Sequence, residues 1–423
     1  MASNAKNLAE LLNTDSTVAV GDIADGSVST AKLADDAVTT AKIGAGAVGT
    51  TEIADDAVTS AKSDGSVAIG KNVIINGGMT VAQRGTSSTG LGTANGYFTC
   101  DRYRHVFNGT AGRLTSSQST DAPVGFANSL KFACTTADTS IAAGEYFFFS
   151  QKIEGQNLQH FAKGTSSAKA FAVSFYVKGN ASATYALELY DADNNRQCSK
   201  SFNVTTSWNR VELIFPADTT GAFDNDNGES LTLSWWLHAG STFTSGTLNS
   251  SGFAANNNAN RALSTTSFFD STSRTFFITG VKLEPVQVTD FEHLFFAEEL
   301  LHCQRYYHRT LDTVAYGQLG GSFMRGNNDK VKGVVEYPVE MRAKPAISVI
   351  GTNGGAFTAQ QGDTALSGTL SFLSMWSTGS DRRSTWLDFQ GATSGTDGYA
   401  CQIYRANNGI GDGAGCLQFE SEL

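Results

Sequence analysis

The stretch that decides the fold is FAVSFYV, residues 171–177, where Phe171, Val173, Phe175 and Val177 alternate with smaller or more polar residues. Alternation of this kind is typical of a strand with one face in a core. Similar alternation recurs at Leu187 and Leu189, at Val211, Leu213 and Phe215, at Leu231, Leu233, Trp235 and Leu237, and at Phe277, Val281 and Leu283. Because turns such as DADNN (191–195) separate these segments, we predict a mainly β chain with a jelly-roll-like sandwich over residues 67–290.

The composition excludes several classes of partner. Only 17% of the 423 residues are charged, and the net charge is −10. An acidic surface repels phosphate backbones, so we expect no nucleic-acid partner. No apolar run reaches about 18 residues, so we expect no membrane insertion. The first residues, MASNAKNLAELL, lack the apolar core of a signal peptide, and we expect assembly in a cytoplasm.

Four ten-residue units lie in tandem between residues 23 and 62: IADGSVSTAK, LADDAVTTAK, IGAGAVGTTE and IADDAVTSAK. Their aliphatic residues recur every five positions, at Ile23, Val28, Leu33, Val38, Ile43, Val48, Ile53 and Val58. A period of five suits neither a helix nor a strand, and one such chain cannot cover its own aliphatics. We therefore predict a stalk of several chains over residues 21–66. The alternative is a flexible linker. Residues 1–20 precede this repeat as a separate N-terminal segment.

One strand of the middle region carries a candidate binding residue. If Trp235 lies on the core face, Trp236 lies on the polar face with His238. An indole ring on a polar face can stack against the C–H face of a sugar, so Trp236 and His238 are candidate glycan-binding residues. The alternative is that Trp236 packs in a subunit interface or under the polar loop of residues 240–267, which is long enough to be functional or mobile.

The C-terminal third is predicted to begin with a connecting helix in residues 291–309. The segment Ala297–Arg309 can place Ala297, Leu300, Leu301 and Tyr307 on one face. A β-rich C-terminal head is predicted over residues 310–423. Its segment STWLDFQ (384–390) places Trp386, Asp388 and Gln390 on a polar face, and these residues with Tyr404 are further candidate glycan-binding residues. Trp376 and Tyr399 are close in sequence. The alternative is a contact between subunits.

No motif for catalysis or for a cofactor stands out. The chain has no GxSxG, HExxH or P-loop sequence, and its candidate acids, apart from Asp388, lie in turn-like strings of Asn, Asp and Gly. Those strings suit turns, or else a weak Ca²⁺ loop. The six scattered cysteines are expected to be reduced and buried, and His302, Cys303 and His308 match no zinc motif. We therefore expect no enzyme activity, no cofactor and no metal.

Several short segments resemble the tail-fibre and receptor-binding proteins of bacteriophages. They are NVIINGG (72–78), AQRG (82–85), YFTCDRY (97–103), EEL with CQRYY (298–300 and 303–307), PVEMRAKP (338–345) and the final SEL. The decapeptide units resemble stalk repeats of the same proteins. The similarity extends over most of the chain as separate landmarks, of which the helix segment and the Met-Arg-Ala-x-Pro segment are the more specific.

The resemblance implies a fibrous homotrimer on a virion that recognises the host surface, with residues 1–20 as its virion-attachment segment and residues 310–423 as its receptor-binding head. Its partners would be phage tail or adaptor proteins at the N-terminus and host polysaccharide or lipopolysaccharide at the heads. Two alternatives remain. One is a neck or capsid-surface fibre that only displays its heads, and the other is a tailspike that depolymerises polysaccharide, which would need two carboxylates at a set separation in a cleft.

Overall fold

The computed structural model describes residues 72–263, 265–310, 317–350, 357–368, 370–375, 381–405 and 416–423, with a few positions of the repeat. Residue contacts divide the chain into two units, Met1–Ala68 and Ile69–Leu423. Residues 1–20 lie outside the described residues, as do Ile23, Val28 and Val58 of the repeat. All the strands among the described residues belong to the second unit.

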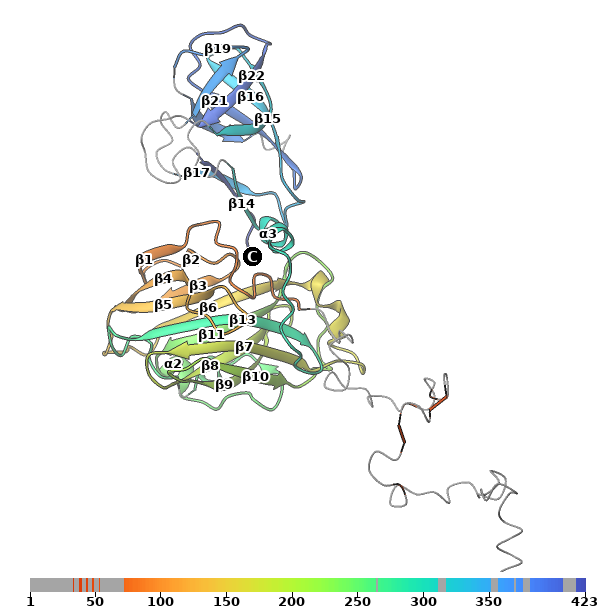
Figure 1. The fold of residues 1–423 in the computed structure, drawn as a ribbon. Coiled ribbons are helices and arrows are strands. Elements are labelled where there is room, and N and C mark those ends of the chain that lie inside the picture. Colours follow the sequence, from red (N-terminus) through yellow and green to blue (C-terminus); the bar gives the residue numbers. More distant parts are fainter. Residues whose placement is uncertain are drawn as a thin grey trace, which may run out of the picture. The chain divides into compact units, whose positions relative to one another are not determined.

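Two antiparallel sheets form a β-sandwich in the second unit and confirm the mainly β prediction (Figure 1). The first sheet has the order β1 (Ser87–Leu91), β4 (Arg113–Ser119), β5 (Ser129–Thr136), β13 (Thr275–Pro285), β7 (Phe171–Gly179) and β10 (Asn209–Phe215). The second has the order β12 (Ala254–Ala255), β9 (Arg196–Val204), β8 (Ala183–Asp191), β11 (Glu229–Ala239), β6 (Tyr146–Glu154), β3 (Arg104–Asn108) and β2 (Gly96–Tyr97). The chain crosses repeatedly between the sheets, as in a jelly roll.

An aromatic core fills the space between the two sheets. Trp235 stacks on Phe149 with ring centroids 5.0 Å apart and planes 7° apart, and Phe132 meets Phe149 edge-on. The alternating residues of β7, from Phe171 to Val177, all lie in this core. Each buried aromatic removes about 150–250 Å² from water, so this core dominates the stability of the sandwich.

The alternation predicted for β13 is wrong at one position. Phe276 and Ile278 enter the core, whereas Phe277 lies on the opposite face, where Lys131 and Lys178 approach its ring. The register of β13 shifts after Thr279 at Gly280, which has a φ of +63°. A β-bulge adds one residue and reverses the facing of the later residues of the strand, so Val281 returns to the core.

Short helical turns cover parts of the sandwich. Two 3-10 turns, η4 (Gly155–Asn157) and η5 (Gln159–Phe161), come after β6, and α2 (Ser241–Thr244) and η6 (Asn258–Asn260) lie in the loop after β11. None of the helices among the described residues is long and apolar enough to cross a membrane.

The predicted connecting helix is shorter than expected. Helix α3 spans Phe296–Gln304, and Tyr307 already belongs to strand β14 (Tyr307–Arg309), which pairs with β23. The buried face of α3 carries Glu299 and Cys303, whereas Leu301 is exposed. The expected apolar face of this helix therefore points away from the chain's own core.

The C-terminal part contains two further antiparallel sheets. The first has the order β14, β23 (Cys416–Glu420) and β17 (Ala346–Ile350). The second, which we call the distal sheet, has the order β19 (Thr364–Ala365), β18 (Phe357–Gln361), β22 (Ala400–Arg405), β15 (Gln318–Arg325), β16 (Lys330–Glu336), β21 (Ser384–Gln390) and β20 (Ser371–Met375). One face of the distal sheet covers a second core that includes Phe323, Val331 and Phe389.

The segments that resemble tail fibres meet in one place, which we call the joint: Arg84, Arg102, Glu154, Arg305 and Glu422 with their partners. Arg305 donates two hydrogen bonds to Glu154, at 2.8 and 2.7 Å. Arg102 forms an ion pair with Glu422, and Arg84 lies 3.2 Å from the same carboxylate. All these charges are paired, as buried charges must be.

Other residues of the tail-fibre-like segments also make structural contacts around the joint. The backbone N–H of Asn76 donates to Glu299 at 2.5 Å, and the Arg342 guanidinium donates to the carbonyls of Ser421 and Glu422. The guanidinium carbon of Arg102 lies 3.4 Å from the Tyr306 ring centroid. The resemblance therefore rests mainly on residues that hold the C-terminal part against the sandwich. All six cysteines are buried, as expected.

Candidate functional site

Trp236 is fully buried on the outer side of its sheet. It packs with Ala186, Phe243 and Ala262, so the loop after β11 covers the ring. Its indole N–H donates to Glu188 at 2.9 Å. The structure thus realises the packing alternative for Trp236 and leaves no ring face for a ligand.

A buried ion pair completes the cover over Trp236. The Arg261 guanidinium donates to both oxygens of Glu188, at 2.8 and 2.9 Å, and its central carbon lies 4.8 Å from the Trp236 ring centroid. Glu188 is fully buried, while the Arg261 side chain is 18% exposed. Glu188 on the sheet accepts hydrogen bonds from Trp236 and from Arg261 of the loop after β11, so this satisfied polar network holds the loop on the sheet.

His238 does not share the face of Trp236, which corrects the prediction that the two lie together. The pairing of β11 with β6 shifts between Trp236 and His238. The imidazole of His238 therefore turns toward the edge of the sandwich core, where Phe269 meets it edge-on at 5.3 Å. The alternation rule fails here for the same reason as in β13, because a bulge adds one residue.

The distal sheet does bring three predicted residues together. Trp386, Asp388 and Gln390 lie on the face of β21 opposite the core residues Leu387 and Phe389. The indole N–H of Trp386 donates to Asp388 at 3.3 Å. Trp386 is half-buried and Gln390 is exposed, whereas Asp388 is buried.

Basic and apolar side chains flank this group on neighbouring strands. Lys332 pairs across from Asp388 and Lys330 from Gln390, and the Lys330 ammonium lies 3.8 Å from the Asp388 carboxylate. Met324 pairs with Lys332 on the next strand and is 48% exposed. We call this set the outer face: Met324, Lys330, Lys332, Trp386, Asp388 and Gln390. It combines an aromatic ring, an amide and ammonium donors on a sheet surface.

Tyr404 does not belong to the outer face. It lies on β22, and β15 and β16 separate that strand from β21. At about 4.8 Å per strand, the two strands are about 14 Å apart. The Tyr404 hydroxyl instead donates to Gln402 of its own strand. Trp376 lies outside the described residues.

A cavity that the sequence did not indicate lies between the sandwich and α3. Its volume is about 550 Å³, and its walls include Ile74, Phe291, Leu294, His302 and Arg305. A cavity of this size can hold a small molecule or a few side chains. Residues of segments 72–78 and 298–307, which both resemble tail-fibre sequences, line this cavity. Hydrophobic periodicity does not predict that these two segments meet.

Three of the acids considered for catalysis have structural partners. Asp191 pairs with the buried ammonium of Lys163 at 2.5 Å, Asp193 accepts the backbone N–H of Asp224 at 2.9 Å, and Asp226 accepts that of Gly228 at 2.8 Å. The first contact is a buried ion pair, the second joins two loops, and only the third is local to a turn.

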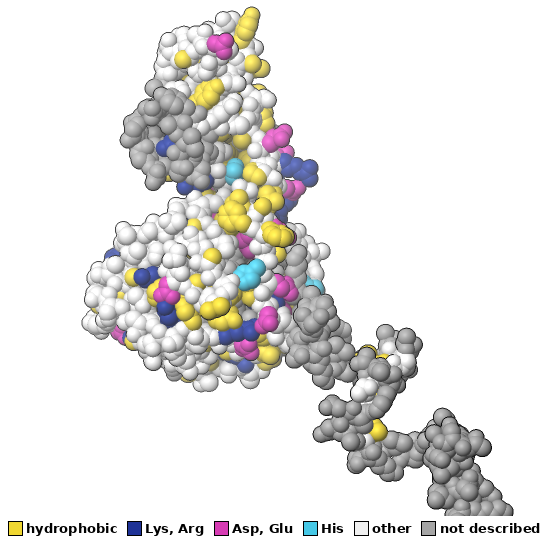
Figure 2. Space-filling model, viewed as in Figure 1, with side chains coloured by type: hydrophobic (Ala, Val, Ile, Leu, Met, Phe, Trp, Pro, Cys, Tyr) yellow, Lys and Arg dark blue, Asp and Glu magenta, His cyan; other side chains and the backbone are white. Residues whose placement is uncertain are grey.

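Exposed apolar side chains gather around α3. Phe295 is 86% exposed and Phe296 61%, with Leu294 and Leu301 beside them in sequence. Figure 2 shows hydrophobic side chains over this part of the surface. Within the repeat, the described residues Leu33, Val38, Ile43, Val48 and Ile53 are 41–54% exposed. Single chains rarely leave several large apolar groups together in water.

No protein-family model matches the sequence, and no curated protein matches it significantly. Among solved structures, a family 30 carbohydrate-binding module is similar at 10% identity and a TM-score of 0.28, covering 55% of this chain and 96% of that one. A family 11 module from Clostridium thermocellum, in complex with a β-1,3-1,4-mixed-linked tetrasaccharide, is similar at 12% identity and 0.25, covering 48% and 98%.

A third similar structure is the enzymatically active domain of tailspike protein 4 of bacteriophage CBA120. It shares 12% identity at a TM-score of 0.26, covering 51% of this chain and 21% of that one. The chain therefore spans about a fifth of the length of that tailspike. At these TM-scores the three similarities carry no argument about activity or ligand.

Proposed function

We propose that this protein is a trimeric fibre of a bacteriophage particle that attaches the particle to surface glycan of its host. The observation that carries the glycan part is the outer face, where a half-buried Trp386 lies beside Asp388, Gln390 and two lysines. The virion part rests on the tail-fibre resemblance of the segments that meet at the joint. The proposed location is the virion, after assembly in the host cytoplasm.

The outer face has the chemical groups that a sugar requires. An indole ring stacks against the C–H face of a pyranose, and amide and ammonium groups bind its hydroxyls. The bond from the Trp386 N–H to Asp388 holds the ring in one orientation, so little side-chain entropy is lost on binding. The lysines would favour an acidic polysaccharide or the phosphates of a lipopolysaccharide.

The exposed apolar groups support assembly from several chains. The repeat aliphatics and the Phe295–Phe296 pair are large apolar groups that additional copies of the chain would cover. Light scattering on the full-length protein should give about three times 44.7 kDa. A monomer at micromolar concentration would contradict the proposed fibre.

Attachment is tested first on cells. Fluorescently labelled full-length protein is incubated with a panel of bacterial strains, and bound strains are treated with periodate, which oxidises vicinal diols of sugars. We expect binding to a subset of strains and its loss after periodate. Binding to no strain by an intact trimer would favour a fibre that only displays its heads.

The outer face is then tested by substitution. Trp386→Ala should weaken cell binding by about tenfold or more, because the stacked ring contributes of the order of 1.5 kcal/mol. Trp208→Ala is the matched control, since Trp208 is a half-buried tryptophan of the sandwich whose N–H donates to Asp121. Equal losses in both variants would place the glycan elsewhere.

We also propose that the fibre binds without cleaving. Incubation of the protein with polysaccharide from a bound strain should release no new reducing ends over hours. Release of reducing ends would favour the depolymerase alternative, and a search for its two carboxylates would then begin at the cavity beside α3, where Glu292 and Glu299 lie.

A further inference from the structure

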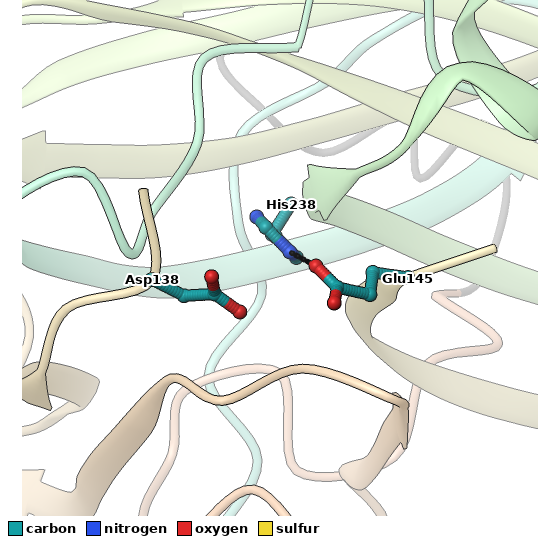
Figure 3. A group of neighbouring side chains, drawn as sticks. All are labelled: Asp138, Glu145 and His238. Atoms are coloured by element: carbon teal, nitrogen blue, oxygen red, sulfur yellow. Dashed lines mark ion pairs between the residues drawn. The ribbon is translucent and has the colours of Figure 1, made fainter. Parts of the chain in front are cut away.

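Three titratable side chains meet at one edge of the sandwich, far in sequence from the outer face. Asp138 lies in the loop after β5, Glu145 precedes β6, and His238 lies near the end of β11. One ligand atom from each lies within 4.8 Å of the others. Figure 3 shows the three side chains directed toward a common space, with His238 and Glu145 facing each other.

The imidazole of His238 offers a buried nitrogen to this space. Its Nδ1 is hydrogen-bonded to the Ser267 hydroxyl at 2.8 Å, which orients the ring. Its Nε2 has no hydrogen-bond partner among the described residues, and the side chain is fully buried. In the tautomer that donates its Nδ1–H to the Ser267 hydroxyl, Nε2 carries a lone pair directed into this space.

The carboxylate oxygens of Glu145 and Asp138 face the Nε2 atom of His238. Glu145 Oε2 lies 3.8 Å from His238 Nε2, and it too has no hydrogen-bond partner among the described residues. Asp138 accepts hydrogen bonds from the Thr110 hydroxyl and the Ala111 N–H, both at 2.8 Å. Hydrogen bonds of this kind favour the charged carboxylate, which is the form that binds a cation.

In that tautomer, His238 Nε2 and the two carboxylates place three electron-pair donors around one space. Buried acceptors that face one another are costly, and native proteins resolve such groups with a partner. At the joint, by contrast, Arg102 and Arg84 supply the cations that Glu422 requires. No lysine or arginine ion pair with Asp138 or Glu145 occurs among the described residues.

We propose that Asp138, Glu145 and His238 bind a divalent transition-metal ion of the Zn²⁺ class. One imidazole nitrogen with two carboxylate oxygens suits Zn²⁺ and its first-row neighbours, whereas Ca²⁺ and Mg²⁺ prefer oxygen ligands alone. Zn²⁺ bonds of about 2.0–2.1 Å in a tetrahedron place ligand atoms about 3.3 Å apart. The 3.8 Å pair needs a small closure, which rotation of the Glu145 side chain can supply.

The ion would close one edge of the sandwich. The loop of residues 137–145 already contacts the segment after β11, because Gly240 N–H donates to the Glu145 carbonyl at 2.8 Å and Thr242 N–H to that of Ala143 at 3.0 Å. A metal bound to His238 as well would tie this loop to β11. Its role would be structural, and the bound ion would raise thermal stability by mass action.

The first test uses the full-length wild-type protein alone. The protein is dialysed against EDTA, returned to chelator-free buffer and titrated with ZnCl₂, CaCl₂ or MgCl₂ by calorimetry, with melting temperature measured in parallel. We expect one Zn²⁺ per chain, a higher melting temperature with Zn²⁺, and at least tenfold weaker binding of Ca²⁺ and Mg²⁺. Binding of no ion, or of Ca²⁺ in preference to Zn²⁺, would overturn the proposal.

The second test assigns the ligands. Glu145→Gln keeps the shape of the side chain, and it should weaken Zn²⁺ binding at least tenfold, as should His238→Gln. His293→Gln is the control, because His293 is an exposed histidine that contacts Phe126 and Phe291 and should leave Zn²⁺ binding unchanged. Unchanged affinity in both ligand variants would refute the site. If a variant fails to fold, the visible absorption spectrum of the wild type with added Co²⁺ gives a second measurement. Absorption bands as intense as those of tetrahedral Co²⁺ support the site, and their absence contradicts it.

Discussion

Two tryptophans with the same sequence signature have different surroundings in the fold. Trp236 on β11 and Trp386 on β21 each lie on the side of a strand opposite its core residues, and each indole N–H donates to a carboxylate. Trp236 is covered by a loop that carries Phe243 and Arg261, whereas Trp386 is half-buried on the outer face. Alternation identifies the face of a side chain, but the cover over that face depends on residues far along the chain.

The largest expected effect is at the covered tryptophan. Trp236→Ala should lower the free energy of unfolding by about 3–5 kcal/mol, because it leaves a cavity between the sheet and the loop. Urea denaturation followed by circular dichroism measures the change, and cell binding of the folded protein should be unaltered. A loss below about 1 kcal/mol would mean that the loop does not cover the ring in solution.

The carboxylate under the same loop comes next. Glu188→Gln should cost about 2 kcal/mol, since it removes the anion that Arg261 and the Trp236 N–H share. The loss is smaller than the 3–5 kcal/mol of a fully enclosed pair because Arg261 is 18% exposed and can reach water. Glu212→Gln, at the exposed pair with Arg210, is the control and should cost less than about 1 kcal/mol.

Acid should weaken the C-terminal part through His308. Burial lowers the pKa of His308 to about 4, and its ring stacks on Phe419 at 5.8 Å. Between pH 6.5 and 4 the unfolded chain binds a proton at this position that the folded chain does not, so stability falls as the pH falls. At pH 5 the effect is about 2 kcal/mol.

The matching variant is His308→Phe, which retains an aromatic ring against Phe419. The variant should lose less stability than the wild type between pH 7 and pH 5, as measured by urea denaturation at each pH. Parallel pH profiles for the two proteins would show that His308 is not buried as described.

The smallest effect on stability is expected at the outer face. Trp386→Ala should lower the free energy of unfolding by about 1 kcal/mol or less while weakening glycan binding by about tenfold, because a half-buried ring contributes little to the core. A loss as large as that of Trp236→Ala would indicate that Trp386 is enclosed between subunits. That outcome would assign it to the fibre interface.

Local sequence patterns predicted the strands well and the helix only in part. The alternation of β7, β8, β10 and β11 identified strands whose core residues are those expected, because period two is a property of the extended backbone itself. The connecting helix was placed at the right segment, but its end was set five residues too late, at Arg309 and not at Gln304. Tyr307 pairs with β23, and that partner lies over a hundred residues away.

The candidate sites were harder to predict than the strands, because they depend on how strands pair and on which loops cover the sheet faces. Trp386, Asp388 and Gln390 were expected together and lie together, since all three belong to one strand. Tyr404 was expected to join them and does not, because strand order places it elsewhere in the sheet. The trio of Asp138, Glu145 and His238 had no signal in the sequence, since three separate segments supply it.

The sequence by itself determined that the chain is mainly β and which residues face the cores over most strands. These properties arise from backbone period and composition, which are local. Only the tertiary structure decided that Trp236 is covered, that bulges turn Phe277 and His238 to unexpected faces, and that the tail-fibre landmarks meet at the joint. Such outcomes depend on one-residue register shifts and on long-range pairing, and a short window of sequence contains neither.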